Sequence, residues 1–232
     1  AFNLMNYRPD LLILDACYMQ TSEVLTEIGT KASYIIGSED RICTDGFPYS
    51  DLLTFWNDYA TLEALCLEIT QTYIASYRPG GSQYQQGINP QLSCSCLRTD
   101  KLDELLGELT NFTASWSDSA AAQYFADARN ECIEFNDLDS DIDLKEFFSK
   151  LMLENIPDSL AVSTEIILEM IDAAFIAQEF YNYSGNVGTA AIWYPVNPQT
   201  FTDLIEFYDN LIFSETGWHL FLEKTFSFGP AL

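Results

Sequence analysis

Cys17 is the residue in this sequence best placed to act as a nucleophile. It follows the apolar run Leu11–Leu14, which predicts a short strand buried on both faces, as in a parallel sheet. A helix is predicted shortly afterwards, because Thr21 or Ser22 can cap its start and apolar residues follow at helical spacing. Ligands of open α/β sheets bind where a strand ends and a helix begins, and a nearby helix start favours a thiolate.

A structural role for Cys17 stays open at this point, because a cysteine beside an apolar run usually belongs to the core. The spacings of the cysteines match no zinc-binding pattern, so we predict no metal site and mostly free thiols. The six cysteines are Cys17, Cys43, Cys66, Cys94, Cys96 and Cys132.

A cysteine nucleophile needs a general base, which is usually His. The sequence contains a single His, His219, in an aromatic segment with helical spacing. We interpret His219 mainly as a packed structural residue, although a catalytic role stays open. Cys17 therefore lacks a convincing partner within this chain.

The charge balance excludes some classes of function. The 232 residues carry 35 acidic and 10 basic side chains, a formal net charge of −25. Such a surface repels nucleic acid and anionic lipid and favours cationic partners. No apolar stretch of about eighteen residues is present, which predicts no membrane-spanning segment. The start lacks Met and a signal-peptide pattern, so we expect a processed piece of a precursor.

The elements around Cys17 predict an α/β fold. A second strand is predicted over 32–38, and it would complete a right-handed strand–helix–strand unit. The loop 39–49, with a turn at Asp45-Gly46, leaves this strand at the same edge as Cys17 and can border the same pocket. Long helices are predicted over 52–76 and 163–183.

The chain is predicted to divide into three parts. Residues 1–77 hold the part of the sheet that bears the nucleophile, residues 78–90 form a loop or linker, and residues 91–232 hold further strands and a helical C-terminal region. Strands are expected at 92–97 and 188–195. The acidic run 136–143 lacks the Gly and Glu of a calcium loop, so we interpret it as a solvated turn.

Four blocks of sequence resemble the clostripain family of cysteine endopeptidases, which belong to the caspase-like clan. These blocks are Leu14–Met19, Glu23-Val24, Tyr34–Glu39 and Gly46–Tyr49. The resemblance implies a caspase-like fold, with a mainly parallel central sheet flanked by helices and a mostly helical C-terminal extension. It also implies a hydrolase that cleaves peptide bonds after Arg or Lys.

The resemblance assigns roles to three residues. Cys17 matches the family nucleophile, while Asp15 and Asp45 match the two acids that bind the basic side chain of the substrate. The family's catalytic His is expected on a separate light chain, cut by autoprocessing from the same precursor and retained as a heterodimer. The alternative is a catalytically inactive caspase-like binding protein that lacks the His.

Further expectations concern location and cofactors. The resemblance implies a bacterial protein that is secreted, periplasmic or at the cell surface. Its partners would be the light chain and proteins or peptides containing Arg or Lys, with no nucleic acid. No cofactor is predicted with certainty, and a calcium requirement stays open.

Overall fold

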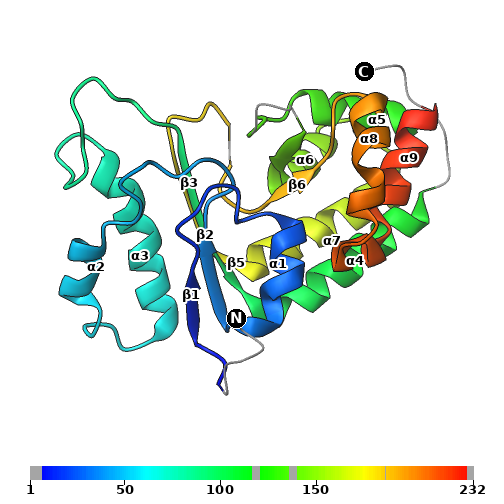
Figure 1. The fold of residues 1–232 in the computed structure, drawn as a ribbon. Helices are drawn as coiled ribbons and strands as arrows, with labels where there is room; N and C mark the ends of the chain where they lie inside the picture. Colours follow the sequence, from blue (N-terminus) through cyan, green and yellow to red (C-terminus); the bar gives the residue numbers. More distant parts are fainter. Residues whose placement is uncertain (1–6, 117–120, 136–139, 186, 229–232) are drawn as a thin grey trace.

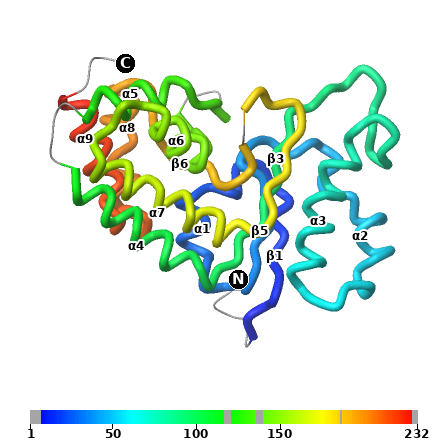
Figure 2. The backbone as a smooth tube through the Cα atoms, turned by 180° about the vertical axis from the view of Figure 1, so that it is seen from behind, coloured from blue at the N-terminus to red at the C-terminus, as the bar shows by residue number. Residues whose placement is uncertain are grey.

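Two groups of helices cover the two faces of one four-stranded sheet (Figure 1). The computed structural model describes residues 7–116, 121–135, 140–185 and 187–228. In the view from behind, α2 (Tyr49–Phe55) and α3 (Leu62–Tyr77) lie on one side of the sheet, and the remaining helices lie on the other (Figure 2). The sheet therefore forms the middle layer of three.

The strands of this sheet lie in the order β1, β2, β3, β5. Their bounds are Leu11–Ile13, Tyr34–Gly37, Leu92–Arg98 and Phe175–Tyr181. β1 pairs parallel with β2, whereas β2 with β3 and β3 with β5 pair antiparallel. The predicted α/β sheet flanked by helices is confirmed. The prediction of a mainly parallel sheet is wrong for the described strands, which form a mixed sheet.

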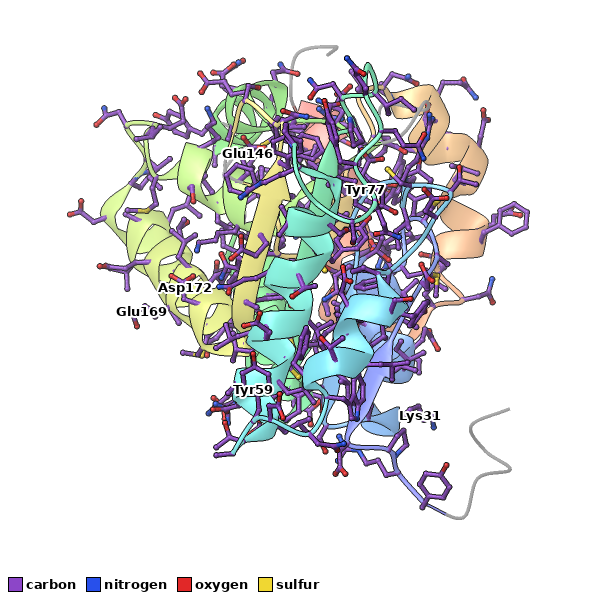
Figure 3. The ribbon with its side chains drawn as sticks, turned by 90° about the vertical axis from the view of Figure 1, so that its left-hand side faces the viewer. Lys31, Tyr59, Tyr77, Glu146, Glu169 and Asp172 are labelled. Atoms are coloured by element: carbon purple, nitrogen blue, oxygen red, sulfur yellow. The ribbon has the colours of Figure 1, made fainter. Side chains whose placement is uncertain are left out.

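A helical hairpin explains the reversed direction of β3. The sequence predicted one helix over 52–76, but the structure has α2 at Tyr49–Phe55 and α3 at Leu62–Tyr77. The side chain of Thr61 accepts a hydrogen bond from the backbone N–H of Ala64 and so caps the N-terminus of α3, which begins as a separate helix. Tyr59 and Tyr77 mark the opposite ends of this returning arm (Figure 3). Because the hairpin brings the chain back to the edge it left, β3 must run antiparallel to β2.

The other face of the sheet carries α1, α4 and α7, with more helices packed outside them (Figure 1). Aromatic rings fill much of the core between these helices, and Phe112, Phe125 and Phe221 contact one another. The helices are α1 Ser22–Ile28, α4 Leu102–Ser115, α5 Ala121–Asn130, α6 Leu144–Leu151, α7 Asp158–Ala174, α8 Pro198–Tyr208 and α9 Trp218–Phe228.

The predicted helix over 163–183 is wrong in its second half. α7 ends at Ala174, and residues 175–181 form β5. Their pairing with β3 decides this, because Ser93 lies opposite Phe180 and Cys96 lies opposite Ala177. The last predicted strand is present as β6, Ala191–Trp193, but it pairs with β4, Asp141–Asp143, in a separate small sheet.

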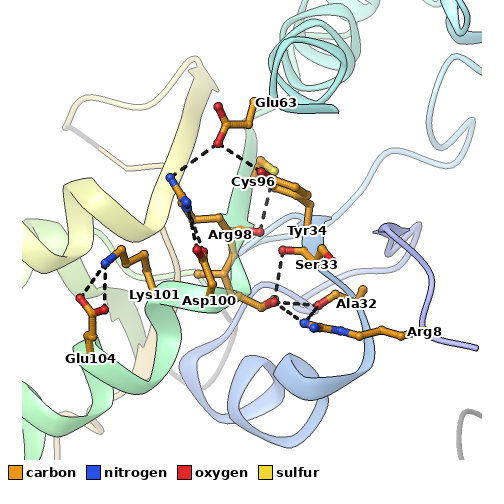
Figure 4. Close-up of polar contacts among 12 residues, drawn as sticks. Arg8, Ala32, Ser33, Tyr34, Glu63, Cys96, Arg98, Asp100, Lys101 and Glu104 are labelled. Carbon is orange, nitrogen blue, oxygen red and sulfur yellow. Dashed lines mark hydrogen bonds and ion pairs between the residues drawn. The ribbon is translucent and has the colours of Figure 1, made fainter. Parts of the chain in front are cut away.

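Polar contacts hold the end of the sheet that is remote from Cys17 (Figure 4). The guanidinium of Arg8 donates to the Ala32 carbonyl and to Thr99 Oγ1, and Thr99 Oγ1 itself donates to Ala32 O. These contacts position the start of β1 against β2 and β3. β1 is only half-buried and is one of the two edge strands of this sheet among the described residues, so the prediction of a strand buried on both faces is wrong there.

None of the helices within the described ranges is long and apolar enough to cross a membrane.

Candidate active site

The chain between β1 and α1 continues to follow β2 past the end of the regular sheet. Leu14 N–H donates to Ile36 O at 2.8 Å, and Gln20 N–H donates to Ser38 O at 3.0 Å. Between these two contacts Tyr18 N–H donates to Asp40 O at 3.2 Å, and Cys17, the residue before it, is exposed. The position predicted for Cys17, just beyond a strand end and shortly before a helix, is therefore the position it has.

The thiol of Cys17 faces the backbone of the loop that follows β2. The Ile42 N–H donates to Cys17 Sγ at 3.4 Å, and the Cys17 thiol donates to the Ile42 carbonyl at 3.9 Å. Tyr18, the next residue, has φ of +58°, a left-handed conformation that costs a non-glycine residue about 1 kcal/mol. Arg41 Nε donates a hydrogen bond to the Tyr18 hydroxyl at 2.8 Å. A strained turn next to an exposed thiol is a feature of functional sites.

Cys17 is the most accessible thiol among the six. Cys66, Cys94 and Cys96 are buried, while Cys43 and Cys132 are half-buried. Burial, followed by the nearby Asp45 and Cys17, raises the pKa of Cys43, so this neighbouring group stays a thiol at neutral pH. The described surroundings therefore favour reaction at Cys17 over reaction at its neighbour.

Asp15 lies against the turn at Gly46. A Cβ atom placed on Gly46 would lie 2.6 Å from Asp15 Oδ2, and Gly46 has φ of +65°. Only glycine satisfies both the close approach and the left-handed backbone. The hydroxyl of Tyr49 donates to Asp15 Oδ2 at 2.9 Å. Burial and this hydrogen bond raise the pKa of Tyr49 to about 12, so Tyr49 keeps its proton and stays a donor.

Asp45 is exposed, and its partners come from the loop between α3 and β3. Gln85 Nε2 donates to Asp45 Oδ2 at 2.9 Å, and Gln83 Nε2 donates to the Asp45 carbonyl at 3.2 Å. The Tyr77 hydroxyl, at the end of α3, donates to Gly46 O at 2.7 Å. The turn that carries Asp45 is thus held by α3 and by the loop that follows it.

The carboxylates of Asp15 and Asp45 both lie at the turn that contains Gly46. Burial raises the pKa of Tyr77, and Cys43, Asp45 and Asp15 raise it further. Asp15 lies against Gly46, the residue that follows Asp45, so both acids lie at the same turn. They form an acidic rim at the Gly46 turn, and Asp15 precedes Cys17 by two residues.

A cavity of about 280 Å³ opens on the Asp45 side of this rim. Its walls come from the segment 41–45, from Tyr77 and from residues 83, 85, 88, 90 and 91 of the following loop. Asp45 borders the cavity, whereas Cys17 and Asp15 lie outside its walls.

His219 lies on α9, in the helical layer. Its Nε2 is 3.9 Å from Asp209 Oδ1, and its Nδ1 is buried without a hydrogen-bond partner. None of the contacts described for His219 involves Cys17. This placement agrees with the interpretation of His219 as a packed residue.

A buried acid pair supports the site from behind, and the sequence did not predict it. Asp143 Oδ2 accepts from Thr189 N–H at 3.0 Å and from the Thr189 hydroxyl at 2.8 Å, while Glu39 Oε2 accepts from Gly188 N–H at 2.7 Å. Burial and the adjacent Asp143 raise the pKa of Glu39 well above its usual range, so the pair retains a proton. The pair fixes the segment around Thr189, which leads to Ala191, whose N–H donates to Gln20 O at 2.9 Å.

Asp143 corrects the interpretation of 136–143 as a solvated turn. Residues 136–139 lie outside the described residues, but Asp143 is fully buried and caps α6 through the Glu146 N–H at 2.6 Å. Contacts between distant segments bring four further residues to the site, namely Tyr49, Gln85, Glu39 and Asp143. No local pattern in the sequence indicates such contacts. No group of three or more His, Cys, Asp or Glu suited to a metal ion occurs among the described residues.

The sequence and the fold were compared with known proteins. A profile of the clostripain family matches residues 4–212. No curated protein matches the chain. An inactive zymogen C11 protease from Parabacteroides distasonis has a TM-score of 0.67 and 20% identity, over 91% of this chain and 59% of its own.

Two further solved structures share the fold. A B. fragilis cysteine protease has a TM-score of 0.67 and 18% identity, over 92% of this chain and 89% of its own. A secreted C11 cysteine protease from Bacteroides thetaiotaomicron, solved with an irreversible peptide inhibitor, has a TM-score of 0.63 and 17% identity, over 90% of this chain and 59% of its own. Since the family profile covers most of the sequence and the fold is that of C11 proteases, the chain belongs to the clostripain family.

Proposed function

We propose that the chain is the heavy chain of a cysteine endopeptidase that cleaves after Arg or Lys. Membership of the clostripain family supports a cysteine peptidase. The observation that carries the assignment of the site is the exposed Cys17, which follows Asp15 by two residues, together with the contact of Asp15 against Gly46, the residue after Asp45. The acids supply charge-assisted hydrogen bonds for a guanidinium or ammonium group.

In the proposed reaction, the Cys17 thiolate attacks the carbonyl carbon after the basic residue. The new S–C bond gives a tetrahedral oxyanion, which the backbone N–H of Cys17 helps to stabilise. When the C–N bond breaks, the leaving amine takes a proton from a His, and a thioester remains. Water then attacks the thioester, releases the carboxylic acid and restores the thiol.

The His is proposed to come from a light chain that pairs with β1. β1 is the outer strand on the Cys17 side of the described sheet, its residues Leu11–Ile13 are apolar, and they are only half-buried. An unpaired apolar strand edge favours pairing with another strand. A parallel strand at this edge would end beside Cys17, where a base is needed. The other outer strand, β5, lies three positions away from β1.

The comparisons support a longer precursor. This chain spans 59% of the zymogen chain from Parabacteroides distasonis, which leaves length for a further strand. Autoprocessing after a basic residue would give two chains that remain in one sheet, as a heterodimer. Secretion by a bacterium is proposed because one relative is described as a secreted protease from Bacteroides thetaiotaomicron.

Peptide hydrolysis tests the proposal directly. The enzyme, purified after expression of the full-length gene, is assayed on matched fluorogenic peptides with Arg, Lys or Gln before the scissile bond, and denaturing mass spectrometry counts its chains. We expect cleavage of the Arg and Lys peptides only, loss of activity in Cys17→Ala, and a second, smaller chain that contains a His. Cleavage by Cys17→Ala, or equal cleavage of the Gln peptide, would contradict the proposal.

Failure of turnover with a folded, two-chain protein would favour a caspase-like binding protein instead. In that case the Arg and Lys peptides would bind without being cleaved, and fluorescence anisotropy would detect the binding. Activity of this chain alone would contradict the light-chain proposal and would require a new role for His219.

A further inference from the structure

The two carboxylates of the site each have one oxygen engaged and one oxygen available. Asp15 Oδ2 accepts from the Tyr49 hydroxyl, and Asp45 Oδ2 accepts from Gln85 Nε2, both at 2.9 Å. Among the described residues, no side chain donates to Oδ1 of either acid. The resting site therefore offers two single oxygens from two different carboxylates.

This arrangement suits an ammonium better than a guanidinium. The ammonium of Lys carries three donors on a point charge, which can each bind a separate oxygen. The guanidinium of Arg gains most when its planar fork binds both oxygens of one carboxylate. Such a bidentate contact with Asp45 requires Gln85 to leave Oδ2.

The side chain of Gln85 can release Asp45 Oδ2, whereas the side chain of Gln83 is held in place. Gln83 is held at three points, because Ser76 Oγ donates to its Oε1 at 2.7 Å, its N–H donates to Ser76 O at 2.9 Å, and its Nε2 binds the Asp45 carbonyl. The Gln85 side chain is exposed, and its one described hydrogen bond is the one to Asp45. Gln83 thus anchors the loop, and Gln85 is its displaceable contact.

We infer that Gln85 is a specificity-determining residue that favours Lys over Arg by occupying one oxygen of Asp45. This inference rests on the proposed function, because it concerns the basic side chain that the site would bind. Tyr49 does not play the same part at Asp15, since it lies on α2 and keeps its proton.

Substitution of Gln85 in the assembled two-chain enzyme tests the inference. In Gln85→Ala, both oxygens of Asp45 become available, and the ratio of kcat/KM for the Arg peptide to that for the Lys peptide should rise about three- to tenfold, the effect of one hydrogen bond. The change should appear mainly in KM for Arg, because the contact exists in the ground state and in the transition state. Gln85→Met, which keeps the length but has no donor, should give the same rise.

Gln86→Ala is the matched control, because Gln86 is exposed on the same loop and does not border the cavity. It should leave the ratio unchanged, and all variants should keep the wild-type melting temperature. An unchanged ratio in Gln85→Ala, in an enzyme that still prefers basic residues, would overturn the inference and leave the proposed function standing. A rise in Gln85→Ala but not in Gln85→Met would also overturn it, since bulk rather than the hydrogen bond would then set the preference. An enzyme without preference for basic residues would refute the proposed specificity itself.

Discussion

Gly46→Ala should weaken the enzyme on basic substrates by displacing Asp15. The added Cβ would lie 2.6 Å from Asp15 Oδ2 and 2.8 Å from Oδ1, whereas ordinary contacts begin at 3.4 Å. The carboxylate must therefore retreat by about 0.8 Å, from 2.6 to 3.4 Å. Hydrogen bonds to charged groups contribute about 1.5–3 kcal/mol, so losing the contact of Asp15 with the substrate predicts a ten- to hundredfold lower kcat/KM.

The substitution has a second effect, on the backbone. Gly46 has φ of +65°, and an Ala in this left-handed conformation costs about 1 kcal/mol of stability. Gly80→Ala separates the two effects, because Gly80 has φ of +91° and a Cβ there would meet nothing within 4 Å. Gly80→Ala should lower the melting temperature by a similar amount and leave kcat/KM unchanged.

The assay compares kcat/KM on Arg, Lys and neutral peptides, in the wild-type enzyme and in an Asp15→Asn background. If the effect passes through Asp15, Gly46→Ala should add little to the loss already caused by Asp15→Asn. Fully additive losses would refute the reasoning, and so would wild-type activity of Gly46→Ala on the Arg and Lys peptides.

Other expected outcomes test the same site and its support. Iodoacetamide should modify Cys17 before the other thiols, and peptide mapping that shows earlier modification elsewhere would contradict this. Asp15→Asn and Asp45→Asn should each cost about 1.5–3 kcal/mol in kcat/KM on basic peptides at an unchanged melting temperature; a loss of fold instead would assign them a structural role. Burial raises the pKa of Glu23 from 4.5 to about 7, so its stabilising effect is complete below pH 4.5 and is lost as the pH rises through about 7. Glu23→Gln should abolish that fall in the free energy of unfolding, measured by urea titration from pH 5 to 8, whereas Glu169→Gln, an exposed control on α7, should retain it.

The sequence correctly predicted those helices and strands whose local apolar pattern agrees with the packing around them in the fold. The apolar runs that became β1 and β2 lie beside one another, and their order placed Cys17 at the rim. The predicted secondary structure was wrong where pairing between strands distant in the sequence determines it. Residues 175–181 form a strand because β3 lies opposite them, and neither Gly nor Pro interrupts the sequence between α7 and β5.

The site was predictable only in part, for a similar reason. Cys17 follows from its place after a strand, whereas Asp15 and Asp45 could be named as a pair only through the family resemblance. The hydrogen bond from Gln85 to Asp45 spans forty positions of sequence, and it forms because the α2–α3 hairpin returns the chain to the rim. Asp143 looked solvated within an acidic run, but donors from a distant loop surround its carboxylate.

The edge of β1, which pairs with no further strand among the described residues, has a consequence for the proposed biogenesis of the enzyme. A light chain supplied separately would have to find this edge by diffusion, in competition with edges of other heavy chains. Under the proposed two-chain organisation, synthesis as one polypeptide would hold the partner strand at an effective concentration in the millimolar range, so that pairing would precede cleavage. We therefore expect that heavy chains expressed alone aggregate edge to edge, and that cleavage of the linking peptide marks the completion of folding.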